Sequence, residues 1–435
     1  MQSDQTQENY DVIVVGGGLA GVLSVIRMVR SNPNLKILLI EKNSVLGGRL
    51  RSTHQATGQW ACGLRGISED LYNFWNQIMK EDPDGDDLPE FGAKQQSRLG
   101  ILQAGKLKEV PYDQAFTEVG AKAFAGPAAV RDWNTIEKLY DAEEKGLKTI
   151  NQGFSQGYTG NKRSPAAPVI ENLSLLWGIP DLWSTQTKSF LERSRFHKSA
   201  PYIGDWDQAI DALLGKLSGA NLTTELDCRI VDSDYKDDVW TLSAEKGSFQ
   251  GKRLVITVPP WEAQLFLPRR HWPKRLASLT SRTKPASLVV LSEFLENLED
   301  VDLPDVMLIP AEGVQVTIDG HEICFRATLD FELTMQAPAV VKAVKRLRRA
   351  RKKFLAAFPN LNSSGDYLAL IPVGWATPLS PGDRRVADPI STKDLHQDHL
   401  LFCGDGYGSD INGDKNFLTS VLSTTDHISN QTKDT

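Results

Sequence analysis

An α/β fold of the Rossmann type is predicted by three features at the start of the chain. Residues 10–15 form a short apolar run rich in β-branched side chains, typical of a strand buried on both faces. Residues 19–29 carry apolar side chains at helical intervals, and residues 36–40 are a second apolar run. A glycine-rich turn joins the first strand to the helix. Strand, turn, helix and strand in this order predict a dinucleotide-binding unit with a parallel sheet.

The glycine turn carries the expected chemistry of this unit. Gly16, Gly18 and Gly21 stand at G-x-G-x-x-G spacing. Gly16 allows a tight turn, Gly18 lets backbone amides approach a pyrophosphate, and Gly21 lets helix and strand pack closely. A diphosphate would lie at the positive end of the helix, against Leu19 and Ala20.

The residue that ends the second strand predicts what the ligand contains. Glu41 follows residues 36–40 directly. An acidic residue at this place accepts hydrogen bonds from the hydroxyls of an adenosine ribose, and the adjacent Lys42 is a further candidate contact. An isolated glycine motif can be a simple turn, but here each part of the unit comes in order.

A second glycine motif indicates which dinucleotide to expect. Residues 46–52 read LGGRLRS, in which Gly48 belongs to a turn and Arg49 is suited to bind phosphate or carboxylate bidentately. The stretch resembles the second glycine-arginine signature of the flavin amine oxidase superfamily. That superfamily includes monoamine, polyamine and L-amino-acid oxidases, protoporphyrinogen oxidase and phytoene desaturases. The resemblance implies FAD rather than NAD, bound non-covalently because Asp383 stands where some members carry a flavin-linked cysteine.

Composition predicts an ordinary globular protein and excludes several classes. The 435 residues are 40% hydrophobic and 24% charged, and the formal charge of −6 gives no overall attraction to nucleic acid. No apolar run approaches the ~18 residues of a membrane span, and the N-terminus lacks the pattern of a signal peptide. The scattered cysteines predict reduced thiols in a cytoplasmic protein, with no disulfide framework and no metal site. They are Cys62, Cys228, Cys324 and Cys403.

The resemblance and the changes in local sequence pattern divide the chain into five segments, which form two domains. Residues 1–66, 202–268 and 396–435 are expected to form the FAD-binding domain. Residues 67–201 and 269–395 are inserted segments expected to form an α+β substrate, or cap, domain.

Local patterns predict the elements of both domains. In the FAD-binding domain, strands are expected at 221–227, 229–235, 239–244, 253–258 and 399–406, with helices at 209–217 and 416–428. In the cap, the expected elements are helices at 69–80 and 337–358, a hairpin of 98–103 with 106–110, and strands at 288–292, 306–309, 322–328 and 367–371.

The helix expected at 337–358 is strongly basic. Between Lys342 and Lys353, eight of twelve residues are Lys or Arg. One interpretation is a patch for an anionic membrane or a nucleic acid. The other is the solvated face of a cap helix, which the negative total charge favours.

The resemblance implies further flavin contacts. The strand ending in Gly404 and Asp405 would meet the ribityl chain and diphosphate, and the closing helix with Phe417 and Leu418 would face the flavin pyrimidine. The family usually has an acidic-glycine-alanine sequence at this helix, whereas this chain has Leu-Thr-Ser. Further contacts are implied at Gly63, Leu64, Arg65 and Ile230.

Five positions bear on the substrate. Arg65 lies in a stretch similar to one in which L-amino-acid oxidases grip the substrate carboxylate, although a flavin phosphate or the loop itself is an equal alternative. Lys284 is the nearest candidate for the family lysine that holds a water at flavin N5, or else a surface residue. Trp375 faces the pocket or packs in the core. Arg384 and Asn416 replace the two aromatic rings of monoamine oxidases, which suits an anionic or polar substrate.

The predicted function is FAD-dependent oxidation of a C–N bond in an amine or amino acid. Its partners would be a small-molecule substrate and O₂ or another electron acceptor. One alternative is a desaturase or porphyrinogen-type oxidase that removes hydrogen from C–C bonds. Another is a flavin-binding chaperone or assembly partner without turnover. The sequence does not indicate an oligomeric state.

Overall fold

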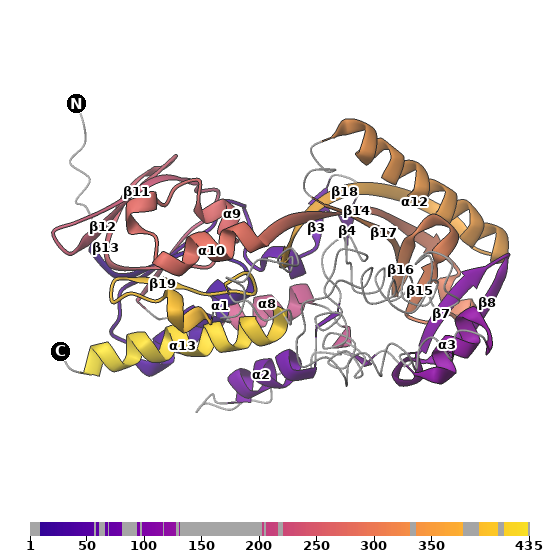
Figure 1. The fold of residues 1–435 in the computed structure, drawn as a ribbon, viewed down its shortest axis with the longest axis horizontal. Helices are drawn as coiled ribbons and strands as arrows, with labels where there is room; N and C mark the ends of the chain where they lie inside the picture. The colour runs from indigo at the N-terminus through magenta and orange to yellow at the C-terminus, as the bar shows by residue number, and fades with distance from the viewer. Residues whose placement is uncertain are drawn as a thin grey trace, which may run out of the picture.

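The structure, a computed structural model, shows two lobes joined by long strands (Figure 1). Each lobe is built on one large sheet. No helix among the described residues is long and apolar enough to cross a bilayer. The residues described are 9–55, 58–60, 66–67, 69–80, 94–95, 98–115, 117–127, 130, 202–203, 206–215, 221–330, 336–376, 391–407 and 413–433.

The sheet of the first lobe is assembled from three separated stretches of chain. Its strand order is β10-β2-β1-β13-β12-β11, with β19 paired to β13. The pairs among β10, β2, β1, β13 and β19 are parallel, whereas β12 pairs antiparallel with β13 and β11. The strands are β1 (Asn9–Val15), β2 (Ile37–Ile40), β10 (Leu222–Glu225), β11 (Ile230–Lys236), β12 (Val239–Ala244), β13 (Gly247–Ile256) and β19 (Leu400–Phe402).

Helices cover both faces of this sheet because alternate side chains of β1 point to opposite sides. Val12 and Val14 pack in one core with α1, α8 and α13, whereas Ile13 and Val15 pack in another with α10. The helices are α1 (Leu19–Ser31), α8 (Trp206–Gly215), α9 (Pro260–Ala263), α10 (Lys274–Arg282) and α13 (Gly413–Lys433).

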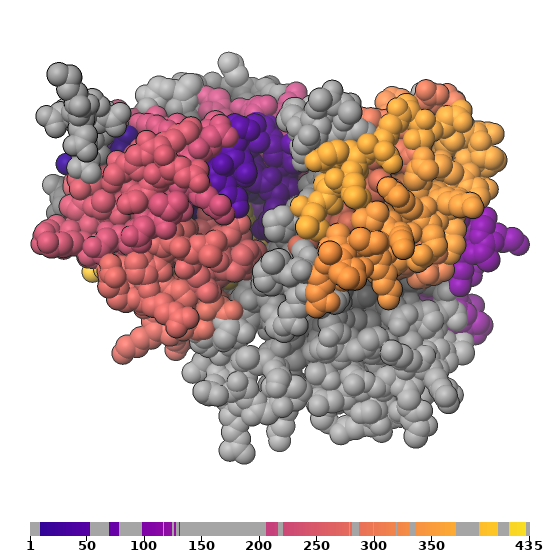
Figure 2. Space-filling model, turned by 90° about the horizontal axis from the view of Figure 1, so that it is seen from above, coloured from indigo at the N-terminus to yellow at the C-terminus, as the bar shows by residue number. Residues whose placement is uncertain are grey.

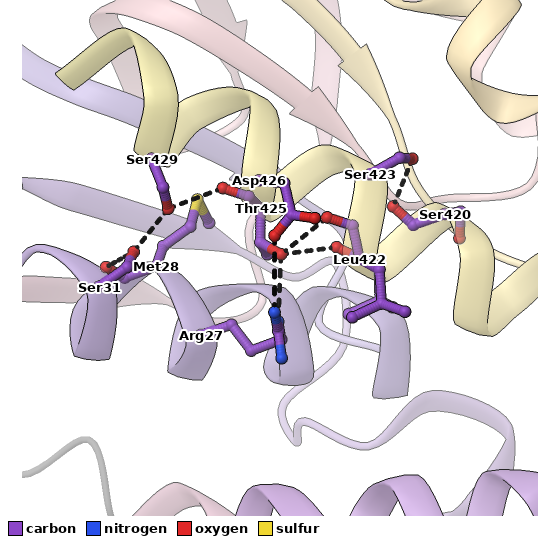
Figure 3. A network of polar contacts seen from close by, with 10 residues as sticks. Arg27, Met28, Ser31, Ser420, Leu422, Ser423, Thr425, Asp426 and Ser429 are labelled. Carbon is purple, nitrogen blue, oxygen red and sulfur yellow. Dashed lines mark hydrogen bonds and ion pairs between the residues drawn. The ribbon is translucent and has the colours of Figure 1, made fainter. Parts of the chain in front are cut away.

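Polar contacts add to the packing of α13 on α1 (Figure 3). Arg27 Nε donates to Thr425 Oγ1 at 3.1 Å, and Arg27 Nη2 lies 3.6 Å from Asp426 Oδ1. Ser429 Oγ donates to Ser31 Oγ at 2.8 Å. These bonds join residues almost 400 positions apart, so the last helix is held to the first by specific hydrogen bonds as well as by apolar burial.

The second sheet has the order β18-β14-β17-β16-β15-β7-β8. Val289, Leu291 and Phe325 on one of its faces pack against Leu347 and Phe354 of α12. Its strands and helix are β7 (Arg98–Gln103), β8 (Lys106–Pro111), β14 (Thr283–Glu296), β15 (Val306–Ile309), β16 (Val314–Asp319), β17 (Glu322–Asp330), β18 (Asn362–Ala376) and α12 (Ala337–Ala357).

The remaining elements are short, apart from two helices. They are α2 (Glu69–Lys80), α3 (Glu118–Ala125), β3 (Thr53–Gln55), β4 (Gly58–Trp60), β5 (Gly66–Ile67), β6 (Lys94–Gln95) and β9 (Tyr202–Ile203).

The α/β fold with a Rossmann-type sheet and a second sheet lobe confirms the predicted fold class. The helix at residues 69–80 and the hairpin of β7 and β8 are also confirmed. Two predictions were wrong in extent: β14 and β18 run far beyond 288–292 and 367–371, since the two pair along nearly their whole length. The residue boundaries of the five proposed segments stay a prediction.

Candidate functional site

The glycine turn after β1 has the geometry that its spacing predicts. Gly16 has φ 114°, and a Cβ on it would lie 2.5 Å from Thr257 Oγ1. A Cβ on Gly21 would lie 2.0 Å from the Gly16 carbonyl oxygen, so Gly21 allows the close helix–strand contact. Gly18 is the N-cap of α1, has no side-chain cap, and would place a Cβ in open space. The start of α1 is therefore open to an anionic ligand.

The two glycine motifs lie side by side. Gly47 N donates to Gly17 O at 2.7 Å, and Gly18 and Gly47 form an isolated parallel bridge. A Cβ on Gly48 would lie 2.9 Å from Gly18 Cα. The second motif thus completes one wall of the same turn, and side chains are excluded where the two backbones meet.

Glu41 is buried at the carboxyl end of β2 and aims its carboxylate at the glycine turn. Its Oε2 accepts the Gly17 N–H at 2.6 Å, and its Oε1 accepts from Asn43 N at 3.0 Å and from Asn43 Nδ2 at 2.7 Å. Three donors satisfy the charge that burial would otherwise disfavour. The neighbouring Lys42 Nζ lies 2.7 Å from Glu262 Oε2.

Arg49 and Asp405 face each other across the opening. Arg49 Nη2 lies 2.6 Å from Asp405 Oδ2, and each side chain is about one-third exposed. Asp405 follows Gly404, which has φ 132° and donates its N–H to Ser420 Oγ of α13 at 2.8 Å. The last strand and last helix therefore position a carboxylate against the second glycine motif.

Two buried groups behind this strand are held neutral. Burial raises the pKa of Cys403 to about 11, so its thiol is protonated at neutral pH. Burial also raises the pKa of Tyr407 well above its usual value, and its hydroxyl donates to Val258 O at 2.7 Å. Both groups are structural supports for the wall of the site.

These elements enclose a cavity of about 340 Å³. In Figure 2 the indigo N-terminal segment reaches the surface between the two lobes. The predicted cofactor residues that line the cavity are Gly16, Gly18, Leu19, Ala20, Glu41, Lys42, Gly48, Arg49, Gly404, Asp405 and Phe417.

A second hollow of about 280 Å³ adjoins the first. The two share Gly16, Glu41, Lys42, Val258 and Glu262, and Ile230 lines the second one only. A ligand longer than the first cavity can therefore continue past Glu41 toward β11.

The other predicted residues lie elsewhere or outside the described residues. Gly21 supports the turn from below, and Leu418 packs partly buried against the core of the first lobe rather than lining the cavity. The backbones of Lys284 and Trp375 are paired directly across β14 and β18, and Asn416 lies in α13. The side chains of these three lie outside the described part, as do Gly63, Leu64, Arg65, Asp383 and Arg384 entirely.

Sequence reasoning missed several residues that line the cavity, among them Leu71, Trp261, Glu262 and Tyr407. A signal existed for two of them. Trp261 and Glu262 follow the carboxyl end of β13, and ligands of α/β sheets bind at that edge. Leu71 comes from α2, whose approach to the site no local pattern could predict.

Comparisons with known proteins agree with this geometry. Residues 14–81 match the NAD(P)-binding Rossmann-like domain family. An uncharacterized protein of Acanthamoeba polyphaga mimivirus is 48% identical over 44 residues, which is 10% of this chain and 9% of the viral protein. The chain thus spans about a tenth of the length of that curated relative.

Solved structures match over almost the whole chain. Cyclohexylamine oxidase from Brevibacterium oxydans IH-35A has a TM-score of 0.64 and 13% identity, covering 98% of this chain and all of the oxidase. Putrescine oxidase bound to putrescine has a TM-score of 0.63 and 12% identity, covering 97% and 99%. A putative protoporphyrinogen oxidase from Exiguobacterium sp. 255-15 has a TM-score of 0.61 and 12% identity, covering 98% and 100%.

Fold and site together define a Rossmann-like dinucleotide-binding domain joined to a second sheet lobe. More particularly, the chain has the fold of cyclohexylamine oxidase and of a putative protoporphyrinogen oxidase, the kind of fold that the two glycine motifs predicted.

Proposed function

We propose that this chain binds FAD non-covalently and is an oxidoreductase that oxidises an amine or amino acid. The observation that carries the proposal is the convergence of both glycine motifs, Glu41 and Arg49 on one cavity. The uncapped start of α1 fits a diphosphate, because its N–H groups and its dipole both favour an anion. Glu41 fits an adenosine ribose, and Asp405 fits the ribityl hydroxyls.

FAD bound in this way would supply the acceptor for a hydride from the substrate carbon. The chain's own residues then have the tasks of binding, orienting and excluding water. Arg49 compensates phosphate charge, while the close approach of Gly18 and Gly48 keeps side chains out of the diphosphate path. Lys284, Trp375, Arg65, Arg384 and Asn416 are proposed to act on substrate.

The choice of an amine or amino acid is supported by the structural similarity to cyclohexylamine and putrescine oxidases. The similarity to a putative protoporphyrinogen oxidase supports the rival, oxidation of C–C bonds. The chain's departure from the family pattern at Leu418–Ser420 supports the third possibility, a flavin-binding protein without turnover.

Anaerobic reduction of the purified protein tests these alternatives. We expect a yellow protein that releases flavin on denaturation and is bleached by a member of an amine and amino-acid panel. Ammonia or aldehyde with peroxide, formed after air is admitted, would identify C–N oxidation. Bleaching by a porphyrinogen or polyene without these products would instead identify the C–C rival. A flavin that no reductant in the panels bleaches would leave a binding role, and a colourless protein that FAD cannot reconstitute would overturn the proposal.

A further inference from the structure

The cationic side chains of the basic helix α12 fall into two groups, one bonded to the second lobe and one facing solvent. Four of the eight, three on one flank of the helix and Arg351 on the other, are bonded to the second lobe. Arg346 donates to the Glu312 and Gly313 carbonyls, Arg349 and Lys353 bind the Glu312 carboxylate, and Arg351 binds Glu293 at 2.6 and 2.7 Å. These contacts fix how the helix is rotated on the sheet.

The other four cations face solvent. Lys342, Lys345, Arg348 and Lys352 are exposed, and none of them takes part in an ion pair among the residues that the structure describes. From the first to the last the helix rises about 15 Å. The 21 residues of α12 include no Asp or Glu, so the charge on this outer face is not compensated within the helix.

Exposed aliphatic side chains adjoin this cationic face. Leu368 and Leu370 of β18 are opposite Leu291 and Val289 of β14, which pack against α12, so all four point to the α12 side of the sheet. The two β18 leucines are 45% and 49% exposed, and Val341 of α12 is 51% exposed. The orange surface of α12 and β18 faces the viewer in Figure 2.

The ion pair between Arg351 and Glu293 shows which flank of α12 lies nearest these leucines. Arg351 reaches Glu293 of β14, and Glu293 is opposite Asp366 of β18. Arg348 lies one turn before Arg351 on the same flank. Cations and leucines therefore form one continuous surface, with Asp366 as the carboxylate that β18 contributes to it.

We propose that the outer face of α12, with Leu368 and Leu370, docks the protein on an anionic phospholipid bilayer. Cationic side chains are attracted to anionic headgroups, and exposed aliphatic side chains can enter the boundary between headgroups and acyl chains. The aliphatic component favours a bilayer over a nucleic acid, whose phosphates need cations but not leucines. This docking surface is independent of the oxidation proposed above.

Vesicle sedimentation tests the proposal with the full-length protein. We expect binding to vesicles of phosphatidylcholine with phosphatidylserine, weaker binding at high salt, and little binding to phosphatidylcholine alone. Replacing Lys345, Arg348 and Lys352 by Ala should lower the partition coefficient about a hundredfold, since each cation contributes about fivefold. Leu368→Ser with Leu370→Ser should lower it about tenfold at unchanged charge.

A second triple variant controls for net charge. Lys106, Lys236 and Lys274 are exposed and lie on other elements, so their replacement by Ala removes the same three charges. We expect this control to bind vesicles within about twofold of the parent. Equal loss in both triples would overturn the proposal, as would equal binding to both vesicle types. Duplex DNA bound more tightly than the anionic vesicles would also overturn it. Circular dichroism verifies that every variant is folded.

Discussion

Arg49 Nη2 and Asp405 Oδ2 lie 2.6 Å apart although 356 positions separate them in the chain. One residue comes from the second glycine motif, and the other lies three residues after the last strand of the first sheet. Their contact brings the beginning and the end of the chain to one edge of the cavity. The pair also keeps a cation at the place where a diphosphate would need one.

Arg49→Ala should raise the dissociation constant for FAD by about ten- to a hundredfold, because a charge-assisted hydrogen bond contributes about 1.5–3 kcal/mol. The free energy of unfolding should fall by less than about 1 kcal/mol, since the ion pair with Asp405 is partly exposed. Titration of the apoprotein with FAD measures the affinity. Arg98→Ala, which breaks a partly exposed ion pair in the other lobe, is the control. Full flavin occupancy in Arg49→Ala would contradict the proposed contact.

Glu41→Ala should weaken FAD retention through loss of the ribose acceptor, about tenfold or more. It should also destabilise the chain, because the Gly17 N–H loses its partner. Glu41→Gln keeps an acceptor and is expected to lie between Ala and the parent. The flavin-to-protein absorbance ratio after desalting measures retention, with the exposed Glu296→Ala as control. Unchanged flavin content in Glu41→Ala would argue against the ribose contact.

Gly18→Ala and Gly21→Ala should separate binding from folding. A Cβ on Gly18 meets no protein atom within 4 Å, whereas a Cβ on Gly21 would lie 2.0 Å from the Gly16 carbonyl oxygen. Gly18→Ala should therefore keep the parent's melting temperature and lose FAD affinity. Gly21→Ala should lower the free energy of unfolding by about 3 kcal/mol or fail to fold. Thermal melting of the apoproteins measures the effect on folding. Equal melting temperatures for the two variants would refute the assignment of Gly18 to binding and Gly21 to folding.

Thr425→Val should lower the free energy of unfolding by about 1–2 kcal/mol, because it removes the acceptor of the Arg27 Nε hydrogen bond in a partly buried place. Asp426→Asn is the matched change on the same helix. Its contact with Arg27 is long, at 3.6 Å, and the Asp426 side chain is 65% exposed, so the cost should stay below about 0.5 kcal/mol. Urea unfolding measures both values. An equal loss of unfolding free energy in the two variants would show that the hydrogen bond from Arg27 to Thr425 stabilises the chain no more than the contact with Asp426 does.

Stability should fall as the pH drops below neutral because of His396. Burial lowers the pKa of this imidazole to about 4, against about 6.5 in an unfolded chain. The unfolded chain therefore takes up the proton first. The contribution is fully present above about pH 6.5 and is lost as the pH falls toward 4, by up to about 3 kcal/mol. His396→Gln should show a smaller difference between urea unfolding at about pH 7 and at about pH 5. A variant with the parent's pH dependence would exclude this residue as the cause.

Local patterns were sufficient for most of the first lobe. Two kinds of cavity residue were predicted. Gly16 and Gly18 were predicted because a tight turn or a close backbone approach requires glycine, and Glu41 and Asp405 because they follow the end of a strand. These requirements are local, so a short stretch of neighbouring sequence is enough to predict them.

What could not be predicted depends on contacts between distant segments. The bridge from Gly18 to Gly47 requires knowing how two loops approach, and the position of Leu71 requires the docking of α2. β16 was missed although Val314, Val316 and Ile318 alternate in it with polar residues, and its place is set by pairing with β15 and β17. The division of α12 into bonded and solvent-facing cations likewise depends on Glu312 and Glu293 in other elements.

The parallel pairing of β19 with β13 has a consequence for synthesis on the ribosome. β1 and β2 emerge early, but β13 gains its β19 neighbour only after residue 402 has been made. Until then the nascent polypeptide holds an incomplete sheet in which residues 254–256 of β13 are an unpaired edge, a state prone to association. The cavity should therefore be completed only after residue 417 has been made, and the growing protein should need protection by chaperones in the interval.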